Sequence, residues 1–100
     1  MNNDKLLNFL GICKRAGCLL SGAETVTKAV NEGKAKIVLY ASDVSDNSLK
    51  GVLRAAQAKD VPIAGIPQDK EALSFALGKH CGIVCTTDAG FAKKISELIN

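Results

Sequence analysis

The sequence contains few aromatic residues, little proline and no long hydrophobic run. It has three Phe, one Tyr, no Trp and two Pro among 100 residues, although 47% of the residues are hydrophobic. The core must therefore be built mainly from Leu, Ile, Val and Ala. No segment approaches the roughly 18 consecutive apolar residues that indicate a membrane-spanning helix, and the first residues do not resemble a secretory signal. These absences predict a single domain over 1–100, located in the cytoplasm and without a membrane partner.

Neither sign of charge dominates the sequence. Thirteen Lys and Arg stand against ten Asp and Glu, which gives a net charge of +3. Strongly basic domains are typical of nucleic-acid binding, so this mild excess permits RNA as a partner without requiring it. Because the sequence has no basic tail, an RNA site would have to be a local, shaped surface.

Motifs for nucleotides, cofactors and redox centres are also missing. The sequence has neither G-x-G-x-x-G nor G-x-x-x-x-G-K-[ST], and it has no C-x-x-C pair. We therefore expect no cofactor and no small-molecule substrate. Cysteines occur at 13, 18, 81 and 85, and without an export signal we expect reduced thiols. Burial in the core is the favoured interpretation of these thiols, with zinc binding or redox chemistry as the alternatives.

His80 is the only histidine, and it directly precedes Cys81. A catalytic nucleophile and its base must meet in space and be oriented by a third group, whereas neighbouring loop residues point in different directions. We therefore do not expect an enzyme, and a small enzyme with a cysteine nucleophile stays as an alternative. His80 is interpreted as a solvent-exposed ring or as one that stacks on RNA.

Hydrophobic periodicity predicts helices and strands in alternation. The first helix is expected to be capped by Asn3 and to end near Arg15, and four strand–helix units follow. The predicted strands cover 18–20, 36–41, 61–66 and 83–86. Pro62 favours an edge position for the third of them. This order predicts an α/β fold, namely a three-layer α/β/α sandwich with a four-stranded mixed, mainly parallel sheet.

The start of the second predicted helix is the clearest candidate for ligand binding. Residues 21–24 match a capping box, with Ser21 as the N-cap and Glu24 as its partner. Free N–H groups at a helix start suit phosphate or carbonyl oxygens, and Gly22 lets a ligand approach the backbone. Lys28 follows on the exposed face. The same features also describe an ordinary capped amphipathic helix.

Five segments, in this order along the chain, match a known family pattern. They cover 22–29, 33–43, 61–63, 73–78 and 87–92. Together they resemble the kink-turn-binding ribosomal protein superfamily, the group of the archaeal L-seven-Ae and eukaryotic L-thirty-e proteins. The last segment resembles the bacterial YlxQ-type branch of that superfamily.

The resemblance implies a non-enzymatic protein that binds a kink-turn or a similar bent internal-loop RNA, with ribosomal RNA among the candidates. In the family, a helix start docks on tandem sheared G·A pairs and a loop covers the extruded base. Glu24 and Thr25 stand where the family has Asn and Glu, so the carboxylate lies one position earlier. The RNA-binding residues implied by this comparison are Gly22, Ala23, Glu24, Thr25, Lys28, Lys79, His80 and Cys81.

Two further expectations concern partners. A protein-interaction module on the same fold, with weak or no RNA binding, is the alternative function. A monomer is expected, because the predicted helices leave no apolar stripe unused once the sandwich is assembled.

Overall fold

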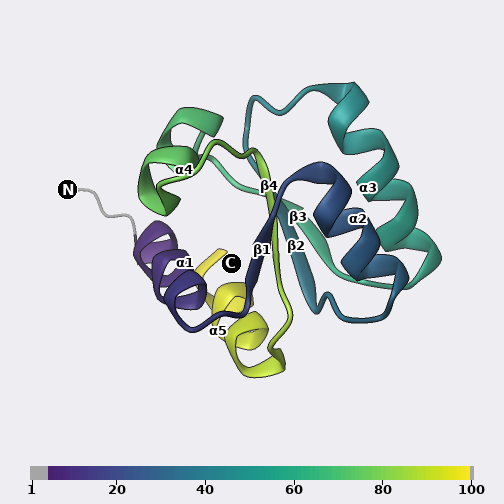
Figure 1. Cartoon of the computed structure of the whole chain (residues 1–100), viewed down its shortest axis with the longest axis horizontal. Helices are drawn as coiled ribbons and strands as arrows, with labels where there is room; N and C mark the ends of the chain where they lie inside the picture. Colours follow the sequence, from purple (N-terminus) through teal and green to yellow (C-terminus); the bar gives the residue numbers. More distant parts are fainter. Residues whose placement is uncertain (1–4, 100) are drawn as a thin grey trace.

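The computed structural model describes residues 5–99, which form five helices and four strands (Figure 1). In chain order these are α1 (Lys5–Arg15), β1 (Leu19–Ser21), α2 (Ala23–Asn31), β2 (Ile37–Tyr40), α3 (Asp46–Ala58), β3 (Ile63–Gly65), α4 (Lys70–Leu77), β4 (Ile83–Thr86) and α5 (Ala89–Ile99). The predicted alternation is confirmed, and the last strand has the predicted bounds. The predicted cap Asn3 lies outside the described residues.

The four strands form one mixed sheet in the order β1-β4-β2-β3. β4 runs antiparallel to both of its neighbours, and only β2 and β3 pair in parallel. The mixed sheet is confirmed, but the expectation of a mainly parallel one is wrong. All four residues of β4 are buried, and a strand covered on both faces has the same apolar pattern in either direction. Pro62 does precede an edge strand, because β3 ends the sheet.

Helices cover both faces of this sheet, which confirms the three-layer sandwich. In Figure 1, α2 and α3 lie on one side of the sheet, while α1, α4 and α5 lie on the other. Leu10, Leu39 and Leu73 are almost fully buried beneath α1, α4 and α5, whereas Val26 and Val52 are buried on the α2–α3 side. None of the helices within residues 5–99 is long and apolar enough to cross a membrane.

Three of the four cysteines are part of this core. Cys13, Cys81 and Cys85 are buried, Cys18 is half-buried, and all four are free thiols. Burial raises the pKa of Cys13 and of Cys85 to about 11. Within residues 5–99, no group of three or more His, Cys, Asp or Glu side chains could hold a metal ion. The positions therefore match the interpretation that these thiols are packing residues.

Candidate functional site

α2 begins one residue later than the predicted capping box requires. Ser21 is the last residue of β1 and lies opposite Val84 of β4. The N-cap is Gly22, which has no side chain that could cap the helix. The capping-box prediction is wrong because the Gly22 N–H donates to the Ile83 carbonyl oxygen at 2.9 Å. This bond extends the β1–β4 pairing to the first residue before the helix, so Ser21 stays in the sheet.

Gly22 joins β1 to α2 in a conformation that only glycine adopts readily. Its φ is 100° and its ψ is 140°, which is a region disfavoured for residues with a Cβ. Space is not the constraint, because an added Cβ would meet nothing nearer than the Thr25 Oγ1 at 4.0 Å. The sharp entry into α2 thus depends on the backbone freedom of this one residue.

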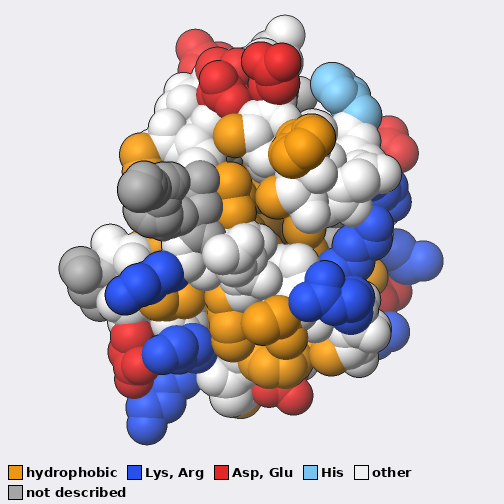
Figure 2. Space-filling view, turned by 90° about the vertical axis from the view of Figure 1, so that its left-hand side faces the viewer, with side chains coloured by type: hydrophobic (Ala, Val, Ile, Leu, Met, Phe, Trp, Pro, Cys, Tyr) orange, Lys and Arg blue, Asp and Glu red, His pale blue; other side chains and the backbone are white. Residues whose placement is uncertain are grey.

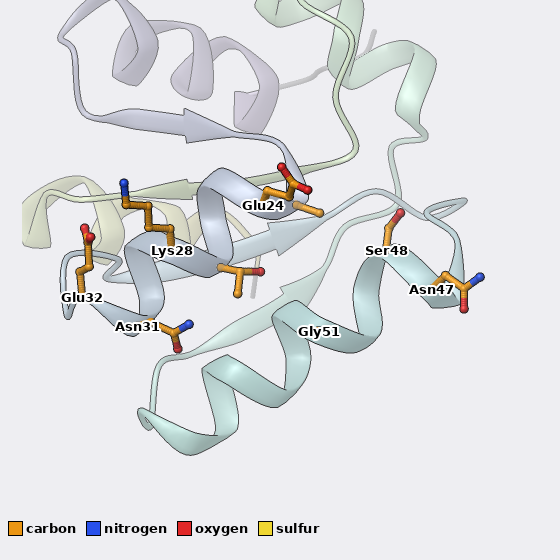
Figure 3. A pocket seen from close by; sticks show the side chains of 9 residues that line it. Glu24, Lys28, Asn31, Glu32, Asn47, Ser48 and Gly51 are labelled. Carbon is orange, nitrogen blue, oxygen red and sulfur yellow. The ribbon is translucent and has the colours of Figure 1, made fainter.

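The exposed face of α2 carries the predicted polar residues. Val26, Ala29 and Val30 are buried against the sheet and α3. Glu24, Thr25 and Lys28 are exposed, as the helical period predicts. Figure 3 shows the Lys28 side chain directed away from α3, while Asn31 points toward it.

The loop after α4 divides into exposed and buried parts. Gly78 ends α4 in the left-handed conformation, and Lys79 and His80 are exposed. Cys81 instead turns inward and is 5% exposed. Its N–H donates to the Ser74 hydroxyl at 3.0 Å, and that hydroxyl donates to the Cys81 carbonyl at 3.1 Å. Ser74 thus ties the loop back to α4 and keeps the Cys81 thiol in the core.

The two predicted segments meet in space at the start of α2. One hollow, of about 180 Å³, joins them on the side of Ala23 and is lined by Ala23, Val44, Ser45, Ser48, Lys70, His80, Gly82 and Ile83. A second hollow, of about 140 Å³, joins them on the side of Thr25 and is lined by Lys14, Leu19, Leu20, Ser21, Thr25, Leu77 and Lys79. The helix start therefore lies between two depressions, each of which also contains a residue of the loop.

Two cations in these hollows were not predicted. Lys70 begins α4, and its Cγ lies 3.0 Å from the position that a Cβ on Gly82 would take. Its backbone N–H also donates to the Asp43 carboxylate at 2.7 Å. Lys14 comes from the last turn of α1. Neither lysine is near the predicted segments in sequence, so only the packing of α1 and α4 on the sheet could reveal them.

The comparisons with known proteins identify the family. Residues 4–96 match the model of the Ribosomal protein L7Ae/L30e/S12e/Gadd45 family. The chain belongs to this family. It is 36% identical over 98 residues to the RNA-binding protein YlxQ of Enterococcus faecium, covering 98% of this chain and 94% of that protein. It is 33% identical over 93 residues to the RNA-binding protein YlxQ of Bacillus subtilis (strain 168), covering 92% of each. The predicted YlxQ-like branch is confirmed.

Solved structures of similar fold agree with this assignment. A protein of unknown function from Bacillus halodurans C matches with a TM-score of 0.89 and 34% identity, covering 97% of this chain and 98% of that one. The 15.5kD RNA binding protein of Giardia lamblia matches with a TM-score of 0.75 and 25% identity, covering 99% of this chain and 88% of that one. Relatives from this family are named as RNA-binding proteins, so the prediction of a non-enzymatic protein is confirmed.

A wider groove between α2 and α3 is less suited to a polyanion. It encloses about 550 Å³ and adjoins the hollow on the Ala23 side, because Ala23 and Ser48 line both. Its charged lining residues are two acidic ones, Glu24 and Glu32, and one basic one, Lys28 (Figure 3). Since like charges repel, a phosphate backbone is better accommodated over the helix start than along this groove.

Proposed function

We propose that the protein binds a sharply bent internal-loop RNA, such as a kink-turn, as a cytoplasmic monomer associated with the ribosome. The observation that carries the proposal is the meeting of the start of α2 with the loop 79–82. Relatives named as RNA-binding proteins support RNA as the partner. Proteins read RNA chiefly at unstacked, irregular elements, and a helix start set between two hollows fits such an element better than a regular duplex.

The exposed groups at the start of α2 suit the edges of guanine bases. The Glu24 carboxylate and the Thr25 hydroxyl can accept hydrogen bonds from guanine amino and imino groups. The absence of a side chain on Gly22 lets RNA approach the backbone at the first turn. Lys28, one turn further along the exposed face, contacts a phosphate.

The hollow on the Ala23 side suits an extruded base. His80 and Lys70 line it together with the apolar Val44 and Ile83. An unstacked base gains stacking on an aromatic ring and contact with apolar walls, and a nearby ammonium group can donate to its ring or carbonyl acceptors. Cys81 stays in the core, and the Ser74 hydroxyl bonds both its N–H and its carbonyl, so Lys79 and His80 are the residues of this loop that face the proposed RNA.

The test is a gel-shift titration with two RNAs. A kink-turn RNA should bind more tightly than the same RNA with its G·A pairs replaced by Watson–Crick pairs, and equal binding would contradict the kink-turn claim. Lys28→Ala should weaken binding and lower the slope of log K against log salt by roughly 1. Lys93→Ala, on the exposed side of α5, is the matched control and should leave both values unchanged.

A second candidate, a protein-interaction module, is favoured by apolar surface on another face. Figure 2 shows hydrophobic side chains gathered on the face formed by α1, α4 and α5. Phe75 is 90% exposed and Ile12 is 44% exposed, and Ile12 lines a shallow hollow of about 280 Å³ with Phe9 and Leu98. A protein partner that survives ribonuclease treatment, and is lost in an Ile12→Ser/Phe75→Ser variant, would support this function.

A further inference from the structure

The hollow on the Thr25 side of α2 has a strongly cationic lining. Lys14 and Lys79 both line it, and none of its lining residues within the described chain, 5–99, is acidic. The hydroxyls of Ser21 and Thr25 add two groups that can donate hydrogen bonds to oxygen. This combination of ammonium groups and hydroxyls around a small depression is suited to an anion.

Lys14 is held at this place by the end of α4. Its Nζ donates to the Leu77 carbonyl oxygen, one of the last carbonyls of that helix, which lack partners within the helix and carry its negative dipole end. The Nζ also lies 3.9 Å from the position that a Cβ on Gly78 would take. An ammonium group has three donors, so two stay available. Because the long side chain is already ordered, binding an anion costs less conformational entropy.

Lys14 and Lys79 act on the same region of the protein. Both lower the pKa of the Cys81 thiol, although burial dominates and raises it overall. Two ammonium groups that line one hollow of about 140 Å³ repel each other, and an anion between them would relieve the repulsion. The groove between α2 and α3, with its acidic excess, provides no comparable place.

We propose that Lys14 and Lys79 together bind a backbone phosphate of the RNA that docks on the start of α2, an inference that rests on the proposed function. Ala23 and Thr25 are two residues apart, which places them on nearly opposite sides of the helix. The hollow on the Ala23 side, proposed for the extruded base, therefore lies on one side of the helix start. The hollow on the Thr25 side, proposed for the phosphate, lies on the other. The RNA strand crosses α2 between them, and Lys14 adds α1 to an interface that the sequence assigned only to α2 and the loop.

The experiment measures how salt affects RNA binding by Lys14→Met, which keeps the apolar length of the side chain. Fluorescence anisotropy with a kink-turn RNA, over a series of KCl concentrations, gives the slope of log K against log salt. The slope should fall by about 1, the effect of losing one phosphate contact, and affinity should fall about tenfold. Lys14→Arg should retain the slope, and Lys93→Met on α5 serves as the control.

An unchanged slope for Lys14→Met overturns the inference, whatever happens to the affinity. If Lys14 has a purely structural role, or if the variant is partly unfolded, the affinity falls by the same factor at every salt concentration. The slope then stays that of the wild type. The proposed function fails separately, when wild-type protein binds RNA equally with and without G·A pairs, because the slope can still be measured on that RNA. The absence of any RNA binding overturns both.

Discussion

Replacing Gly22 by alanine tests whether the turn into α2 requires glycine. The backbone at this position has a φ of 100° and a ψ of 140°. Its N–H donates to the Ile83 carbonyl, and its own carbonyl accepts from the Val26 N–H at 2.9 Å. The residue therefore connects the sheet to the first helical turn, and a change of its dihedral angles would break one of the two connections.

The magnitude follows from backbone strain alone. A Cβ at Gly22 would have open space, so no steric contact with a neighbour adds to the cost. A non-glycine residue held in so sparsely populated a region costs about 1–3 kcal/mol. Alanine also restricts the unfolded chain, which offsets about 0.4–1 kcal/mol of that cost. We expect Gly22→Ala to lower the free energy of unfolding by about 0.5–2 kcal/mol, or several degrees in Tm.

Gly51 provides a matched control in the same protein. It lies in the middle of α3, is exposed, and a Cβ added there would have nothing within 4 Å. Its φ lies outside the range that disfavours other residues. Alanine is favoured over glycine in a helix interior by about 0.5–1 kcal/mol, so Gly51→Ala should raise the free energy of unfolding. The same substitution is thus expected to act in opposite directions at two positions.

The assay is urea denaturation followed by circular dichroism for wild type and both variants. Equal m-values would show that each variant exposes the same surface on unfolding, so that a shift in midpoint reports stability. A Gly22→Ala variant as stable as Gly51→Ala would refute the reasoning, because residue 22 then could not have the backbone conformation described. Such a result would also remove the argument that the sharp entry into α2 positions Glu24 and Thr25.

Three further predictions concern buried groups. Thr86→Val should destabilise the protein by about 1–3 kcal/mol in the same urea assay, because Thr86 is 1% exposed and donates to the Cys18 carbonyl at 2.9 Å; no loss would contradict that hydrogen bond. A thiol reagent at neutral pH should modify Cys18 first, since Cys13, Cys81 and Cys85 are buried, and equal labelling of all four in folded protein would argue against the core. The pKa of Cys13 and of Cys85 is about 11 in the folded protein, compared with an ordinary value of 9.0. Between pH 9 and pH 11 these thiols therefore lose their protons only in the unfolded state. Stability should therefore fall as pH rises from 9 to 11, measured by Tm, and Cys85→Ala should weaken that fall.

The sequence determined the elements and the faces that they bury. Apolar spacing is a local property of a helix or strand, so the positions of Val26 and Ala29 along α2 mark its buried face and leave Lys28 on the exposed one. Helix ends are also local, because Gly78 adopts a positive φ directly after α4 and Gly33 adopts one two residues after the end of α2. The family pattern added the fold class and the candidate surface, because its segments keep their order along the chain.

Tertiary structure alone decided how those elements are assembled around the candidate site. The direction of β4 could not be derived, since burial on both faces gives one apolar pattern for either direction. Ser21 matched a capping box, but pairing with β4 held it in the sheet and left Gly22 to begin the helix. Lys14 and Lys70 reached the start of α2 only because α1 and α4 pack on the sheet beside it. Spacing along the chain reports neighbours within one element, whereas a binding surface depends on contacts between elements, and these form only when the sheet is assembled.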